Sequence, residues 1–111
     1  MENTKIHTTF GEHLKELRET ACLTLRDVST NIGVDYSHLA KVEKNQRTPT
    51  RQLIKSLAIF FETSEQELLN DWLSDQIAYK ILDENVDIKI LKVAEEKVSY
   101  LKKLHNENDN D

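Results

Sequence analysis

The chain of 111 residues is poor in the residues that interrupt helices or form disulfides. It has two glycines and one proline, and this composition predicts a mostly helical protein. One cysteine, Cys22, excludes an internal disulfide, and no second cysteine or pair of histidines at ligand spacing accompanies it. We therefore expect no metal site and no cofactor, and a half-buried structural thiol at Cys22.

Long apolar runs are also missing. No stretch approaches the roughly 18 residues that a membrane helix requires, and the first residues lack the apolar region of a signal peptide. We expect a cytoplasmic protein with no membrane partner.

Acidic residues outnumber basic residues in the whole chain, but the two kinds are unevenly distributed. The net charge of −5 divides into −1 over residues 1–70 and −4 over residues 71–111. The segment 36–55 instead carries +4, with Glu43 as its one acid and five basic residues: Lys41, Lys44, Arg47, Arg51 and Lys55. Because attraction to phosphate depends on local charge, this segment is a candidate DNA-binding surface.

Residues 23–50 carry the clearest structural pattern, two short helices joined by a tight turn. Gly33 stands where the first helix must end in a left-handed residue, and Asp35 is a good N-cap for the second helix. Ser29 is small and would let the two backbones approach closely. Apolar residues fall at helical spacing on both sides of the turn: Leu25, Val28, Ile32, Leu39 and Val42.

This pattern leaves polar side chains on the outer face of the second helix. A short helix of this kind can enter a major groove about 12 Å wide and contact base edges near its N-terminus. The predicted base-contacting residues are Tyr36, Ser37, His38 and Lys41.

Capping signatures mark the other helix starts. A Ser or Thr followed three residues later by an acid occurs at Thr9, Thr24 and Ser64, and Thr50 follows the one proline, Pro49. In the helix that follows Thr50, Leu53, Leu57 and either Phe60 or Phe61 are expected to face inward. In the first helix the expected buried stripe is Phe10, Leu14, Leu17 and Ala21.

Residues 10–69 resemble the Xre/Cro-type, phage-repressor-like helix-turn-helix regulators. Besides the turn, the resemblance rests on residues 10–18, 42–45, 47–50, 53, 57, 58 and 61. It implies an all-α fold: a five-helix DNA-binding bundle in residues 1–70, followed by a C-terminal helical extension. Two positions depart from the family pattern, with Leu25 where glutamine is common and Cys22 where a glycine commonly closes the first helix.

The resemblance also implies phosphate contacts on both sides of the predicted recognition helix. After that helix the phosphate-clasping loop is Lys44, Asn45, Gln46 and Arg47. Before it, backbone amides and the helix dipole at Thr24, Leu25 and Arg26 are expected to bind another phosphate.

Residues 71–105 are expected to form a helical extension that joins two chains. Its first helix spans residues 71–82, and residues 83–85 break it before a last helix at about 87–105. The last helix has apolar residues at alternating spacings of three and four, which is typical of a short coiled-coil seam. The predicted dimerisation residues are Trp72, Ile77, Ile81, Leu91, Ala94, Val98 and Leu101. The alternative is that this stripe folds back onto the chain's own domain. Residues 106–111 are expected to be a flexible polar tail.

These features predict a transcription regulator that binds double-stranded DNA at an inverted-repeat operator as a homodimer and is nucleoid-associated when bound. Repressor and activator remain open, and its own operon or a restriction-modification operon is the favoured target. The alternative is a protein-interaction module, or an antitoxin component, that has lost specific DNA binding. The missing glutamine and the net acidity favour that alternative. An enzyme is not expected, because the histidines are scattered and no carboxylate pair or glycine-rich phosphate loop occurs.

Overall fold

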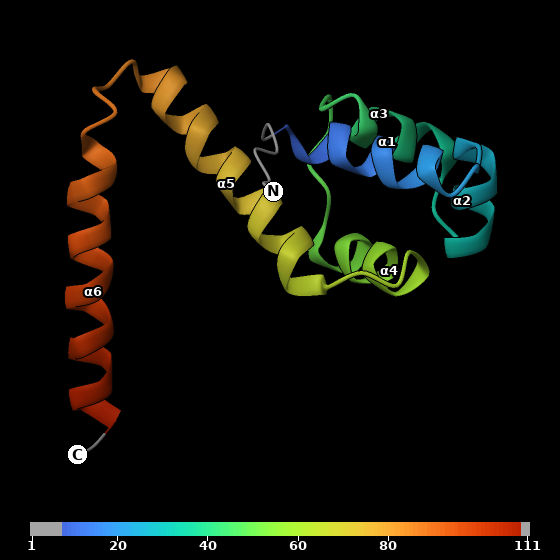
Figure 1. Ribbon diagram of the computed structural model, residues 1–111. Helices are drawn as coiled ribbons and strands as arrows, with labels where there is room; N and C mark the ends of the chain where they lie inside the picture. Colours follow the sequence, from blue (N-terminus) through green and yellow to red (C-terminus); the bar gives the residue numbers. More distant parts are fainter. Residues whose placement is uncertain (1–7, 110–111) are drawn as a thin grey trace, which may run out of the picture. The chain divides into compact units, whose positions relative to one another are not determined.

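The computed structural model describes residues 8–109, and over that range it is all-helical (Figure 1). The six helices are α1 (Phe10–Thr20), α2 (Leu25–Ile32), α3 (Tyr36–Glu43), α4 (Arg51–Phe60), α5 (Glu65–Glu84) and α6 (Ile90–Asp109). The predicted all-α fold is confirmed. The chain divides into two compact units, one that ends at Gln76 and one that begins at Ile77. Within the described range no helix is both long and apolar enough to span a membrane.

The first unit is a helical bundle in which α3 contacts both α1 and α2, and α2 also contacts α4. Its core combines residues from five helices, because α5 contributes Leu68. Leu17, Phe60 and Phe61 are partly buried against this core, whereas Ala21, expected in the buried stripe of α1, is exposed. The buried apolar residues are Phe10, Leu14, Val28, Leu39, Val42, Leu53, Ile54, Leu57, Ala58 and Leu68.

The predicted helix starts are confirmed. Thr9 and Thr24 form complete capping boxes with Glu12 and Asp27, in which each hydroxyl accepts from the acid's N–H and each acid accepts from the threonine N–H. The backbone N–H of each threonine holds the pKa of its capping acid below the ordinary value. Thr50 caps α4, and the Ser64 hydroxyl accepts from the N–H of Glu67 at the start of α5.

Left-handed residues end several helices, and most of them are not glycine. Gly33 ends α2 with φ 71°, as predicted from the turn. Cys22 has φ 59° after α1, so it supplies the conformation for which a glycine would be expected. Its side chain is exposed, and the prediction of a half-buried thiol is wrong. The thiol points outward because the left-handed residue lies beyond the last turn of α1.

The helix α5 is longer than the sequence pattern indicates. The sequence predicts one helix that starts after Ser64 and a separate one at residues 71–82, with a domain limit at residue 70, whereas α5 runs unbroken through that limit to Glu84. Neither glycine nor proline occurs between Ser64 and Asn85, so nothing in this stretch interrupts the backbone hydrogen bonds. Asn85 then takes φ 53° and ends the helix.

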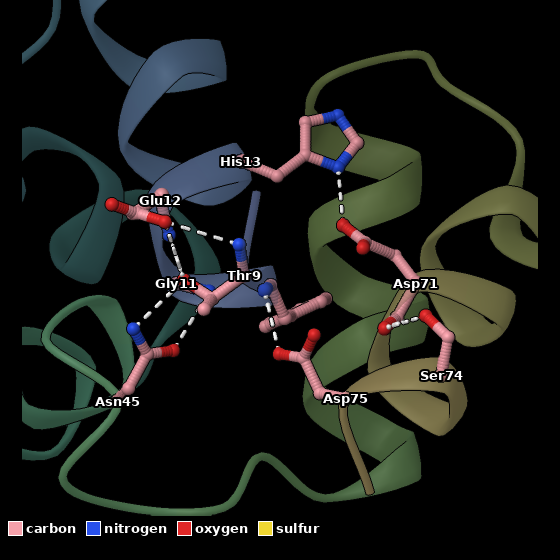
Figure 2. A network of polar contacts seen from close by, with 9 residues as sticks. Thr9, Gly11, Glu12, His13, Asn45, Asp71, Ser74 and Asp75 are labelled. Atoms are coloured by element: carbon pink, nitrogen blue, oxygen red, sulfur yellow. Dashed lines mark hydrogen bonds and ion pairs between the residues drawn. The ribbon is translucent and has the colours of Figure 1, made fainter. Parts of the chain in front are cut away.

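The N-terminus of α1 is held from two sides, as Figure 2 shows. On one side the Asn45 side chain accepts from the Gly11 N–H at 3.1 Å and donates to the Thr9 hydroxyl at 2.8 Å. On the other side two carboxylates of α5 reach α1. Asp75 accepts from the Phe10 N–H at 2.8 Å, and Asp71 lies 2.7 Å from Nδ1 of His13. These contacts join the start of α1 to the end of α3 and to α5.

Gly11 allows the closest of these approaches. A Cβ at this position would lie 2.4 Å from the carbonyl oxygen of Glu43 and 2.8 Å from that of Val42. Gly33 is the opposite case, because a Cβ there would meet nothing within 4 Å and only its positive φ disfavours a side chain.

We therefore expect Gly11→Ala to lower the free energy of unfolding by about 1–3 kcal/mol or more, the usual range for overpacking a tight contact. Gly33→Ala, limited to backbone strain of about 1–2 kcal/mol, is the matched control. Urea unfolding followed by circular dichroism measures both. A loss of less than about 1 kcal/mol in Gly11→Ala would contradict this account, because it would show that the tight contact of Gly11 with the carbonyls of Val42 and Glu43 relaxes at little cost.

The surroundings of Asp75 disfavour the charged form of its carboxyl group. Burial raises the pKa of this carboxyl above its ordinary value of 3.8, and repulsion from Asp71 and Glu12 adds to the rise despite the N–H of Phe10. The folded state therefore favours the protonated form. This term stabilises the fold below pH 3.8 and is lost as the pH rises through the raised pKa.

Asp75→Asn keeps an oxygen that accepts from Phe10 and removes the charge. We expect it to raise the free energy of unfolding at pH 7 by about 0.5 kcal/mol, the scale of a partly exposed charge interaction, and the gain to vanish below pH 3.8. Denaturant unfolding across this pH range measures the gain. Asp83→Asn, at an exposed position of α5, is the control and should change stability little at any pH. A less stable Asp75→Asn protein at pH 7 would contradict this account.

Candidate nucleic-acid interface

The turn between α2 and α3 is fixed by backbone hydrogen bonds. The N–H groups of Gly33 and Val34 both donate to the carbonyl of Ser29, and Asp35 accepts from the N–H of His38 at 3.1 Å. Ser29 is buried, as its small size predicted, and its hydroxyl donates to the carbonyl of Arg26. The direction of α3 relative to α2 is therefore set by this turn and by the core behind it.

Three of the four residues predicted to contact bases are exposed on α3: Tyr36, Ser37 and Lys41. The fourth, His38, is half-buried, and only its backbone takes part in the cap. The inward side of the same helix carries Leu39 and Val42, both within the core. The structure thus separates an apolar face of α3 from a polar one.

The start of α2 lies next to the start of α3. The guanidinium carbon of Arg26, the second residue of α2, lies 4.8 Å from the ring centroid of Tyr36, the first residue of α3. This distance is typical of a cation–π contact. Arg26 and Tyr36, predicted as a phosphate contact and a base contact, thus form one unit.

The N-terminus of α2, where the sequence predicts a phosphate contact, leaves few backbone donors free. The N–H of Thr24 donates to the carboxylate of Asp27 at 2.9 Å, so it is already occupied. Leu25 is half-buried against the core and offers only its backbone. The amides of Leu25 and Arg26 belong to the first turn, where helical N–H groups have no acceptor within the helix. These two amides are the donors that remain for a phosphate.

The acid of the basic segment 36–55 does not face solvent. Glu43 is 8% exposed, and its two oxygens accept from Nε and Nη2 of Arg18 at 2.9 and 2.8 Å. A further Arg18 nitrogen donates to the carbonyl of Leu23, and the bond to Glu43 raises the pKa of Arg18 further. The surface of this segment therefore has no exposed acid, while all five of its basic residues are exposed: Lys41, Lys44, Arg47, Arg51 and Lys55.

The loop after α3 is partly a structural element. Lys44, Gln46 and Arg47 are exposed, as a phosphate-clasping loop requires. Asn45 has φ 61°, and its side-chain amide is engaged with Thr9 and Gly11. Its side chain thus positions the loop, and its neighbours supply the free donors.

Comparison with known proteins fits this geometry. A family model described as helix-turn-helix matches residues 14–68. The chain is similar to the crystal structure of the restriction-modification controller protein C.AhdI from Aeromonas hydrophila, with 32% sequence identity and a TM-score of 0.51. The match covers 53% of this chain and 89% of the C.AhdI chain. The chain belongs to the Xre/Cro-type helix-turn-helix family of DNA-binding regulators.

A second solved structure shares the fold of the present chain over a longer stretch. The match to a chain of the SinR protein/SinI protein complex covers 86% of the present chain and 99% of the matched chain, with a TM-score of 0.53 and 20% identity. No match was found among curated proteins.

The sequence did not indicate the structural roles of Arg18, Glu43 and Asn45. Glu43 was counted as a surface charge, and Asn45 as a phosphate contact. A partial signal was available for Glu43, because it directly follows the core residue Val42 and precedes the helix end at Lys44. Its partner in α1 is 25 residues away and could not be identified from local spacing.

We expect Lys44→Ala/Arg47→Ala to weaken binding to all duplex DNA alike. Each lost phosphate contact should lower the slope of log K against log salt by about 0.9. Filter binding to random duplexes between 50 and 200 mM salt measures this slope. The control is Lys80→Ala/Lys92→Ala, which removes the same charge from exposed sites in the C-terminal unit and should leave the slope nearly unchanged. Equal slopes for the two double variants would place the phosphates elsewhere.

Proposed function

We propose that this protein is a homodimeric, sequence-specific transcription regulator that binds an inverted-repeat operator. The observation that carries the proposal is the exposed basic surface around a fixed helix-turn-helix: segment 36–55 presents five basic side chains and buries its one acid. Local positive charge of this kind attracts the phosphate backbone even when the whole chain is acidic. In this proposal the protein is cytoplasmic, and it is nucleoid-associated when it is bound to DNA.

On this proposal α3 enters the major groove, and its polar face contacts bases through Tyr36, Ser37, His38 and Lys41. Lys44, Gln46 and Arg47, which follow α3, bind phosphates on one side of the groove. The first amides of α2 bind a phosphate on the other side. The phosphate contacts fix the position of α3, and the α3 side chains select the sequence.

The C-terminal unit supports dimerisation. Most of the exposed large apolar side chains of the described chain lie in this unit, and no side chain of α6 is buried as far as Glu107. Apolar surface of this extent on a regulator is typical of an interface. The exposed residues are Ile77, Tyr79, Leu82, Val86, Ile88, Ile90, Leu91, Val93, Val98, Tyr100, Leu101 and Leu104.

The apolar face of α6 is wider than a coiled-coil seam. The predicted seam of Leu91, Ala94, Val98 and Leu101 is exposed, and Ile90, Val93, Tyr100 and Leu104 extend it on one side. At roughly 100° per residue these positions span about half of the helix circumference, and Lys97 is the one charged residue within this arc. A two-stranded coiled coil buries a narrower stripe. We therefore propose that each chain contributes α6 and the C-terminal part of α5 to the dimer.

Trp72 has a different role from the other predicted dimerisation residues. It packs partly buried against the core of the first unit, and its indole Nε1 is buried without a hydrogen-bond partner in the described chain. Ile81 is half-buried, whereas Ile77 is exposed. The proposed interface therefore rests on the residues from Ile77 onward.

The proposed target is the protein's own operon or a restriction-modification operon. Support comes from the 32% identity to C.AhdI, which is described as a restriction-modification controller protein. The domain that this identity spans is the one that would contact DNA, and the similarity extends over 89% of C.AhdI.

The test is selection of bound sequences from a random duplex pool, performed with the wild type and with Leu101→Glu. We expect the wild type to recover an inverted repeat whose half-site centres lie about one helical turn, or about 34 Å, apart. Leu101→Glu places a charge in the centre of the apolar face of α6 and should yield a monomer with at least tenfold weaker binding to the same site. Analytical ultracentrifugation gives the oligomeric state.

The control variant is Ser99→Glu, which adds the same charge to the polar face of α6 and should behave as the wild type. A wild-type monomer that recovers single half-sites would refute the dimer but keep the DNA-binding role. No enrichment at low salt would refute the regulator and favour a protein-interaction module.

A further inference from the structure

The contact between Arg26 and Tyr36 has a chemical property that its neighbours lack. A guanidinium that lies over an aromatic ring is held by the ring face and does not use its N–H groups for a conventional hydrogen bond there. Beyond the Tyr36 ring, no side-chain hydrogen bond or ion pair holds the Arg26 guanidinium within the described chain. The adjacent acid, Asp27, is already engaged with the N–H of Thr24. Arg26 therefore presents a fixed and unpaired fork of donors.

The ring determines where this fork lies. Tyr36 begins α3 and is 42% exposed, so it stands at the end of the helix that faces DNA in the proposed function. The contact with the ring places the Arg26 guanidinium beside the N-terminus of α3. Side chains at this end of a recognition helix contact base edges.

Among the polar residues around the start of α3, Arg26 alone has the geometry for a bidentate contact. The side chains of Ser37 and His38 offer single donor or acceptor groups, and Lys41 carries a point charge one turn further along α3. The O6 and N7 atoms of guanine match an arginine fork, and this pairing is the commonest specific contact in the major groove.

We propose that Arg26 reads one guanine in each half-site, and that Tyr36 is a positioning residue that holds the guanidinium in place. The proposal rests on the proposed DNA-binding function and deepens it. It assigns Arg26 a role in specificity, in place of the phosphate contact expected from the sequence. It also makes the face of the Tyr36 ring a support for Arg26, so that this face is not free for a thymine methyl.

The test uses the site recovered by selection, with its guanines replaced one at a time by 7-deazaguanine, which lacks the N7 acceptor. For the wild type we expect one guanine per half-site at which the replacement weakens binding about 5- to 150-fold. Arg26→Ala should bind the unmodified site more weakly and lose sensitivity to replacement at that guanine alone. Arg26→Lys keeps the charge without the fork and should lose most of the sensitivity.

Two Tyr36 variants separate support by the ring from direct contact. Tyr36→Phe keeps the ring and should retain the sensitivity to 7-deazaguanine, whereas Tyr36→Ala should reduce it several-fold. Arg47→Ala is the control for a phosphate contact and should weaken binding while leaving the sensitivity intact. Circular dichroism confirms that each variant is folded, which is expected because all these positions are exposed.

The outcomes distinguish this inference from the function on which it rests. If the wild type binds its site but Arg26→Ala keeps the full sensitivity at every guanine, Arg26 contacts only phosphate and the inference is overturned. Full sensitivity in Tyr36→Ala would overturn the positioning role of the ring. If the wild type selects no site, the proposed function fails first, and the inference fails with it.

Discussion

The buried pair of Arg18 and Glu43 is the interaction on which the arrangement of the first three helices depends. It joins α1 to the last residue of α3, and the same guanidinium holds the carbonyl of Leu23 in the turn before α2. A carboxylate placed in this interior without its partner would be strongly destabilising. The pair also has an electrostatic effect at the surface, because it removes the one acid from a segment that exposes five basic side chains. This contact thus orients α3 and leaves the charge on the surface of segment 36–55 positive.

A second set of contacts extends this arrangement to the loop after α3 and to α5. Asn45 and Asp75 each accept from a backbone N–H in the first turn of α1, where helical donors have no acceptor of their own. The start of α1 therefore connects the loop after α3 with the helix that continues into the C-terminal unit. The absence of a side chain at Gly11 lets the backbones of α1 and α3 meet closely enough for these bonds to form.

Local signals in the sequence predicted the elements well, because their causes lie within four residues. Thr9 and Thr24 bond to acids three residues later, and Gly33 takes its left-handed conformation from its own backbone freedom. The pairing of Glu43 depends on a partner 25 residues away, and the bond from Gly11 to Asn45 spans 34 residues. Neither has a repeating spacing that a sequence pattern could reveal. The polar face of α3 was predictable because it is the complement of an apolar stripe, whereas the contact of Arg26 with Tyr36 exists only because the fold brings two helix starts together.

The scarcity of glycine has a consequence for how this chain can change. Left-handed residues follow α1, α3, α4 and α5 at Cys22, Asn45, Glu62 and Asn85, and none of them is glycine. Each such residue carries backbone strain in the native state, yet restricts the unfolded chain more than a glycine would. Glycine at Cys22 or Glu62 would therefore relieve this strain and keep the left-handed turn, whereas Asn45→Gly would also lose the side-chain bonds to Thr9 and Gly11. The ends of α1 and α4 thus hold a reserve of stability that a single exchange for glycine would release.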